Sequence, residues 1–300
     1  MIGVGFTAVT LPAMPSPPPE SLMPVVVWVV SLYGLLFFAG LPLFFRFVAA
    51  EGLRGLVHPE RMLWLKTRAW SPLDALGILA VLLGINLTLS LGYSVLQPLF
   101  HWRDWSEQAW LVIQSIAFHW MGFLLMILWA QQRGFDLHAA FSLPRHRTRE
   151  SLVKGLGFLT GAMPVVILSH VVFFIALVLA GIPIEAQDVT RVIAATDHWV
   201  AKGYFVLLGV VIAPIVEEML FRGILLPALA SVVHPVLAMV GTSLLFALFH
   251  ANLLSFAVLF MLSMALSCAM IQTRNLGVSI VMHALFNAIP MTALVMGGFS

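Results

Sequence analysis

Charged residues are scarce in this sequence. Of its 300 residues, 9% are charged and 61% are hydrophobic, whereas soluble domains carry about 25% charged residues. The mean hydropathy is +1.02. A soluble fold of this size cannot bury so much apolar surface in one core, and a disordered chain would be polar and charged. The composition excludes both classes and predicts a protein embedded in lipid.

Cysteine is almost absent as well. Cys268 stands alone, so neither an intrachain disulfide nor a thiolate metal cluster is possible. The net charge of +2 is too small to predict a nucleic-acid partner. Residues 1–21 lack Lys and Arg and are rich in proline, which predicts a short extended tail rather than a cleavable signal peptide. Residues 185–199 predict either an interfacial amphipathic helix or a solvated connector.

The apolar residues occur in long runs. A transmembrane helix needs about 20 such residues, and the runs predict an all-α, polytopic transmembrane helical bundle of about eight spans. The sixth and seventh spans are short and are separated by a polar break at Ala251–Asn252. The eight predicted spans are 22–45, 73–97, 109–131, 152–181, 203–229, 235–250, 254–272 and 277–297.

Basic residues are distributed unequally between the two sides of this bundle. The side with more Lys and Arg is predicted to be cytoplasmic, which places both termini on the opposite face. The connections place twelve Lys and Arg on that side: Arg46, Arg54, Arg61, Lys66, Arg68, Arg133, Arg145, Arg147, Arg149, Lys154, Arg222 and Arg274. The other side has Arg103, Arg191 and Lys202.

A few ionisable residues lie inside the apolar runs, where each needs a partner or a function. Glu218 and Arg222 are four residues apart, so they share a helix face and can form an ion pair. Glu217 lies about 100° further round the helix and points away from Arg222. We therefore expect Glu218 and Arg222 to support the site, and Glu217 to be a free carboxylate facing a cavity.

Two other spans contribute polar side chains at the same spacing. Phe246 and His250 are four residues apart, as are His283 and Asn287, so each pair shares a helix face. Imidazoles, a carboxamide and a carboxylate that meet inside a bundle can activate a water molecule and stabilise an oxyanion.

Each feature also has a structural explanation when taken alone. A buried Glu–Arg pair is about as often structural as functional, and a single histidine in a span is more often a packing group. We leave His119 and His170 out of the site for that reason. Several such features on three spans are much harder to explain as packing.

The pattern resembles the signature of the CPBP family, which comprises CAAX proteases and bacteriocin-processing enzymes and is also called the ABI family. The order and the internal spacing of the motifs agree, and the resemblance covers roughly residues 200–297. Three motifs carry it: Glu217-Glu218-x-x-x-Arg222, Phe246-x-x-x-His250 and His283-x-x-x-Asn287.

The resemblance implies an intramembrane endopeptidase of the glutamate type. It implies that Glu217 is the catalytic base and that His250 positions or activates the water. His283 and Asn287 would form the oxyanion site, while the Glu218–Arg222 pair would support the architecture. We divide the chain accordingly into N-terminal transmembrane helices with basic loops (1–150) and a catalytic helical bundle (151–300).

Three alternatives remain open. Glu217, His250 and His283 could bind Zn²⁺ with an open position for water, although no H-E-x-x-H motif is present. The protein could be a non-catalytic immunity or scaffold protein that keeps the fold. A proton-coupled transporter would also use buried carboxylates and histidines, but no internal repeat supports it.

These considerations lead to a set of expectations about partners and location. We expect no cofactor, with zinc as the open alternative. The expected partners are membrane lipid and a peptide or protein substrate, for which a prenylated tail and a leader peptide are the two candidates. We expect an integral, multi-pass protein of a bacterial plasma membrane.

Overall fold

The computed structural model describes residues 23–50, 58–99, 107–143, 148–183, 193 and 199–297. The tail expected over 1–21 and nearly all of the segment 185–199 lie outside these ranges. Every regular element in the described ranges is helical, and they contain no strand. The all-α prediction is therefore confirmed.

The helices fall into an N-terminal and a C-terminal group, with η denoting a π-helical segment. The first group is α1 (Met23–Ala50), α3 (Pro59–Lys66), α4 (Pro72–Leu99), α5 (Glu107–Ser115), η3 (Ile116–Trp120), α6 (Met121–Gln132) and α7 (Leu137–Phe141). The second is α8 (Thr148–Leu179), α10 (Trp199–Leu207), η4 (Leu208–Ile212), α11 (Ala213–Glu218), η5 (Met219–Leu225), α12 (Leu226–Ala230), α13 (Pro235–Phe249), α14 (Leu253–Thr273) and α15 (Leu276–Gly297).

Seven of the helices in the described ranges are long and apolar enough to cross a membrane, which is the make-up of an integral multi-pass protein. The sixth predicted span, 235–250, corresponds to α13, whose 15 residues reach only about 22 Å at the rise of an α-helix; as predicted, it is short. The prediction that the seventh span is also short is wrong, because α14 has 21 residues. Its apolar run extends to Leu253 and Thr273.

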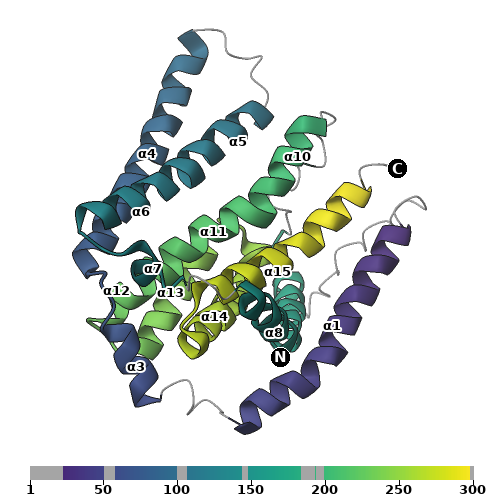
Figure 1. Ribbon diagram of the computed structural model, residues 1–300. Coiled ribbons are helices and arrows are strands. Elements are labelled where there is room, and N and C mark those ends of the chain that lie inside the picture. Colours follow the sequence, from purple (N-terminus) through teal and green to yellow (C-terminus); the bar gives the residue numbers. More distant parts are fainter. Residues whose placement is uncertain are drawn as a thin grey trace, which may run out of the picture.

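The helices pack around α8 and the long α10–α12 segment. Helix α8 contacts α1, α14 and α15, and α15 also contacts η4 and α11. In Figure 1 the segment α10–α12 runs between α6 on one side and α15 on the other. The start of α1 and the end of α15 lie at the same end of the bundle (Figure 1), which agrees with an even number of crossings when α13 is included.

The α10–α12 segment is one continuous helix of 32 residues, from Trp199 to Ala230. Half of the residues in its most apolar stretch are buried, whereas 6% of those in the corresponding stretch of α1 are. Such a helix has to be central to the bundle, and its polar residues must find partners among its neighbours. Glu217 lies near the middle of this helix.

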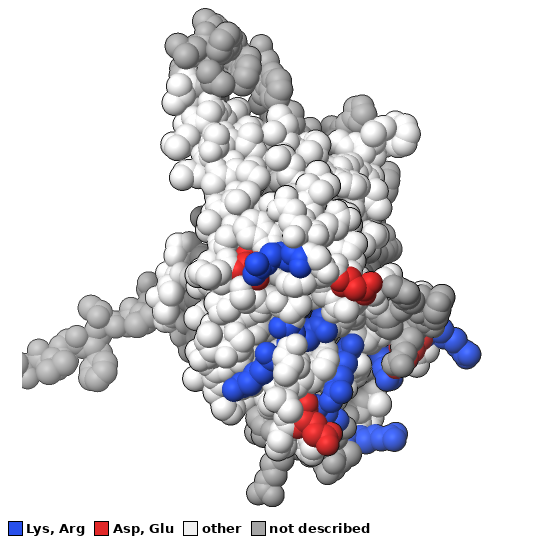
Figure 2. Space-filling view, turned by 60° about the vertical axis from the view of Figure 1, so that its left-hand side comes forward, with Lys and Arg blue, Asp and Glu red and all other residues white. Residues whose placement is uncertain are grey.

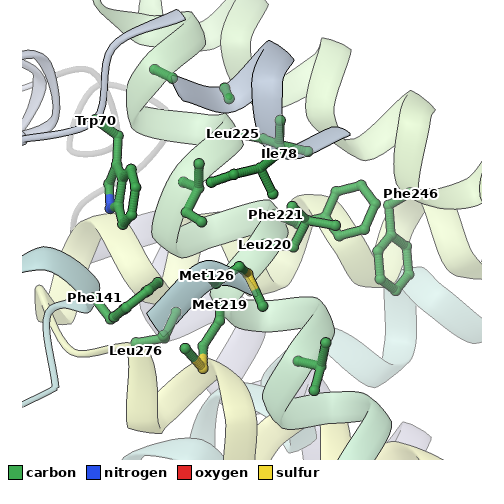
Figure 3. Packing of buried hydrophobic residues seen from close by; sticks show 14 of the residues in the cluster. Trp70, Ile78, Met126, Phe141, Met219, Leu220, Phe221, Leu225, Phe246 and Leu276 are labelled. Carbon is green, nitrogen blue, oxygen red and sulfur yellow. The ribbon is translucent and has the colours of Figure 1, made fainter. Parts of the chain in front are cut away.

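A hydrophobic cluster surrounds the second half of this helix. Met219, Leu220 and Ile224 are each at most 2% exposed and pack with side chains from α4, α6, α7 and α15. Figure 3 shows Phe221 beside Phe246 of α13, with their ring centroids 5.1 Å apart in an edge-to-face arrangement. Since so many elements meet here, the position of each polar side chain in the helix is strongly constrained.

Charged side chains gather at one end of the bundle. Figure 2 shows Lys and Arg in the lower half of the face, whereas its upper half is largely free of charge. In Figure 1 this is the end at which α1 finishes and α3 lies. The distribution agrees with the expected excess of basic residues on one side. That this side is cytoplasmic stays a prediction.

Helices α8 and α15 approach closely at a glycine. A Cβ atom on Gly155 would lie 2.6 Å from Cγ1 of Val281 and 3.1 Å from the carbonyl oxygen of Val278. Gly157, one half-turn further along α8, has no heavy atom within 4 Å of the corresponding position. The small side chain is therefore required for helix packing at Gly155 and not at Gly157.

We predict that Gly155→Ala destabilises the protein whereas Gly157→Ala does not. The added methyl group at Gly155 would push α15 away from α8, and overpacking of this kind costs about 1–3 kcal/mol. Thermal unfolding in detergent measures the difference, and Gly155→Ala should lower the melting temperature by several degrees. Equal melting temperatures for the two variants would show that the helices do not meet at Gly155.

Candidate active site

A buried ion pair forms the base of the site. Arg222 Nη1 donates to Glu218 Oε1 at 2.7 Å, and the two side chains are 1% and 0% exposed. Arg222 Nη2 donates to the carbonyl and hydroxyl oxygens of Ser263 in α14, at 2.9 and 2.6 Å. The ion pair expected from the four-residue spacing is present. Its extension to Ser263 fastens the central helix to α14.

His283 joins this pair from α15. Its Nδ1 lies 2.9 Å from Glu218 Oε1, the oxygen that also accepts from Arg222. A carboxylate oxygen is an acceptor, so Nδ1 carries the hydrogen. The His283 side chain is 2% exposed. The opposite ring nitrogen, Nε2, points toward Glu217 and lies 3.9 Å from its Oε2.

Phe246 closes the apolar side of this cluster. The guanidinium carbon of Arg222 lies 4.9 Å from the centre of its ring, a cation–π distance. The same ring contacts the imidazoles of His250 and His283, at centroid distances of 4.8 and 5.6 Å. Phe246 is fully buried, so it holds these three groups at fixed positions around one aromatic ring.

Glu217 differs from Glu218 in both exposure and partners. Its side chain is 14% exposed, whereas that of Glu218 is fully buried. Among the described residues, Oε2 of each carboxylate is buried without a hydrogen-bond partner, but Oε1 of Glu218 accepts from both Arg222 and His283. Glu217 is therefore the carboxylate that solvent or substrate can reach, and Glu218 is part of the support.

His250 is positioned by the turn between α13 and α14. It follows the last residue of α13, and its Nδ1 donates to the carbonyl oxygen of Phe246 at 2.8 Å. Ala251 has a positive φ of 47°, and the Asn252 side chain caps α14 by accepting from the backbone N–H of Ser255 at 3.0 Å. The tight polar break expected at Ala251–Asn252 is present. Because Nδ1 of His250 donates to the Phe246 carbonyl, its other ring nitrogen, Nε2, is left as an acceptor.

Asn287 lies one turn beyond His283 on α15. Its Nδ2 donates to the carbonyl oxygen of Gly209 in η4 at 2.9 Å. The side chain is partly exposed, and an amide nitrogen has a second hydrogen to donate. Five of the six predicted residues thus meet in one cluster, from the central helix, the α13–α14 turn and α15, while Asn287 lies one helical turn away on α15 and is bonded to Gly209. Their catalytic roles stay predictions.

One residue of this cluster is absent from the sequence-based site. His119 lies in η3, and its Nε2 is 3.8 Å from Glu217 Oε1. It stands alone in its span with no motif around it, so the sequence predicts a packing group rather than a site residue. His170, left out for the same reason, packs against Phe174 of its own helix. The sequence carries no signal that separates the two histidines.

The donor set does not fit the zinc alternative. Among the described residues, no group of three or more His, Cys, Asp or Glu side chains has the arrangement of a metal site. This arrangement therefore supports no metal-dependent step.

Buried carboxylates and imidazoles thus surround a reachable acceptor within this helical membrane bundle. In a comparison with known proteins, residues 199–289 match the family described as type II CAAX prenyl endopeptidase Rce1-like. This part of the chain is therefore similar to the Rce1-like CAAX protease family, the resemblance that the motifs predicted. No curated protein and no solved structure matches the chain.

The buried ion pair gives a stability prediction. Replacing Arg222 by Met leaves Glu218 buried with one partner fewer, and breaking a buried pair costs about 3–5 kcal/mol. Lys154→Met provides the matched control, because it breaks an i,i+4 pair with Glu150 whose side chains are 45% and 31% exposed. That pair contributes about 0.5 kcal/mol or less.

Thermal unfolding of the two purified variants is the measurement. Arg222→Met should unfold well below the wild type or fail to accumulate, while Lys154→Met should unfold at the wild-type temperature. A wild-type melting temperature for Arg222→Met would contradict the supporting role of the pair.

Proposed function

We propose that this protein is an intramembrane endopeptidase in which Glu217 activates a water molecule for attack on a peptide bond. The observation that carries the proposal is the contrast between the two adjacent carboxylates. Glu218 is fully buried and enclosed by Arg222 and His283, whereas the side chain of Glu217 is 14% exposed. The peptidase character of the family supports the same reaction class.

The first step is the transfer of a proton from water to Glu217. Oε2 of Glu217 accepts one hydrogen of the water, and Nε2 of His250 accepts the other as a hydrogen bond. The neutral tautomer of His250 suits this role, because its Nδ1–H is engaged by the Phe246 carbonyl and leaves a lone pair on Nε2. The water oxygen then attacks the peptide carbonyl carbon.

The second step is the collapse of the tetrahedral intermediate. The carbonyl oxygen becomes an oxyanion, for which the second hydrogen of the Asn287 amide and a protonated His283 are the donors. The C–N bond then breaks, and the leaving amine takes the proton that Glu217 received from water. No acyl-enzyme forms in this scheme, and Glu217 returns to its carboxylate form.

The substrate we propose is a peptide or protein segment that reaches Glu217 within the bundle. A C-terminal prenylated tail and a leader peptide are the two candidates, and the family description favours the first. The bacterial plasma membrane remains our proposal for the location.

The proposal predicts that Glu217→Gln abolishes turnover while the protein still folds and inserts. The amide is close in shape to the carboxylate but cannot accept a proton from water. Wild type and variant would be reconstituted in lipid vesicles and incubated with a peptide library that includes farnesylated CAAX peptides. Mass spectrometry would identify the products, with and without a zinc chelator.

Products from the wild type alone, unaffected by the chelator, are the expected result and would also identify the substrate class. Full activity of Glu217→Gln would overturn the proposal. Activity that requires stoichiometric zinc would favour the metal version instead. If a deletion strain is complemented equally by wild type and Glu217→Gln, the protein acts as a non-catalytic partner.

A further inference from the structure

The imidazole of His119 lies within ion-pair distance of Oε1 of Glu217, the proposed base. In the described part of the chain, the imidazoles within ion-pair distance of Glu217 are those of His119, at 3.8 Å from Oε1, and His283, at 3.9 Å from Oε2. His119 lies outside the matched residues 199–289. It reaches the site from the N-terminal helices, across an interface between distant parts of the chain.

The hydrogen-bonding pattern of His119 indicates what it does. Its Nδ1 lies 3.0 Å from the carbonyl oxygen of Ser115, and its Nε2 faces the Glu217 carboxylate. Both ring nitrogens thus face acceptors, and an imidazole satisfies two acceptors only when both nitrogens carry hydrogen. His119 is therefore arranged to donate toward Glu217, unlike His250, whose Nε2 we assign as an acceptor.

Several contacts fix His119 in this position. It lies in a π-helical segment, η3, whose wider turn changes which side chains face the central helix. The hydroxyl of Ser115 is hydrogen-bonded to that of Tyr204 in α10 at 2.8 Å. On the other side of His119, a Cβ on Gly122 would be 3.9 Å from Cγ1 of Val216, the residue before Glu217.

The far end of α6 is anchored as well. Trp129 Nε1 donates to Asp74 Oδ1 at 2.9 Å, and Arg133 Nη2 donates to Asp74 Oδ2 at 3.1 Å. These bonds hold α6 against α4, and α6 continues directly from η3. The helix that carries His119 is thus held at both ends.

We propose that His119 is a positioning residue for Glu217. Its Nε2, 3.8 Å from Oε1, is placed to donate to that oxygen once a bound substrate tightens the site, and so directs Oε2 toward the water and the scissile carbonyl. The inference rests on the proposed function. It adds that the working site is shared between the N-terminal helices and the Rce1-like domain.

The test compares three variants of His119 in full-length protein reconstituted in vesicles, with the peptide found to be cleaved by the wild type. His119→Ala removes both ring contacts. His119→Gln retains a donor near the position of Nε2, whereas His119→Asn retains one only near that of Nδ1. His170→Ala is the matched control, because His170 is also an intramembrane histidine but packs on Phe174 of its own helix.

We expect His119→Ala and His119→Asn to lower kcat by about 10- to 100-fold, the scale of a misplaced catalytic group, with KM changed less than about twofold. His119→Gln should recover at least about half of the lost activity on a logarithmic scale, since its donor reaches Glu217. The melting temperatures and the activity of His170→Ala should equal those of the wild type.

Two results would overturn the inference. The first is an unchanged kcat in His119→Ala. The second is an equal loss in all three variants together with lowered melting temperatures, which would indicate a structural role. Glu217→Gln run in parallel separates the proposals: if it is inactive while His119→Ala is fully active, only the inference about His119 fails. If Glu217→Gln is active, the proposed function itself fails.

Discussion

The site depends on the burial of the Arg222 guanidinium. A cation inside a membrane bundle requires an anion and further hydrogen-bond acceptors, and Arg222 finds them in Glu218 and Ser263. Once Glu218 is fixed in this way, its Oε1 also fixes His283 on α15. The pair thereby joins the central helix to α14 and α15, and the neighbouring Glu217 lies outside it.

The neighbouring carboxylates can serve different functions because their surroundings differ. The side chain of Glu218 is fully buried, whereas 14% of the Glu217 side chain is exposed. Three imidazoles lie around the cluster, and their local bonds distinguish them. His250 donates to a backbone carbonyl and offers a lone pair, while His119 and His283 have acceptors near both ring nitrogens. Residues of the same type are thus distinguished by their position and hydrogen bonds, which decide whether we assign them to the support of the site or to the proposed reaction.

Composition and spacing predict much of this structure. The lack of charge predicts a membrane bundle, and the four-residue spacing predicts the ion pair between Glu218 and Arg222. The polar break at Ala251–Asn252 predicts the turn that positions His250. These features are local in the sequence, so helix geometry and turn chemistry are sufficient to predict them.

The remainder of the site could not be predicted because it depends on contacts between distant segments. His119 meets Glu217 only after α6 packs against the central helix, and its direction depends on a π-helical segment that a regular 3.6-residue period does not anticipate. The bond from Asn287 to Gly209 in η4 is of the same kind. Helix α14, Leu253–Thr273, extends one residue beyond the predicted span 254–272 at each end.

The central claim is that water attacks the peptide bond directly, with Glu217 as the base. Single-turnover cleavage in H₂¹⁸O with hydroxylamine present tests it, with mass spectrometry of both the product and the Glu217-containing peptide. The account predicts one ¹⁸O atom in the new carboxyl group, no hydroxamate and no label in Glu217. A hydroxamate product, or ¹⁸O in the Glu217 side chain, would reveal a covalent intermediate and contradict the account.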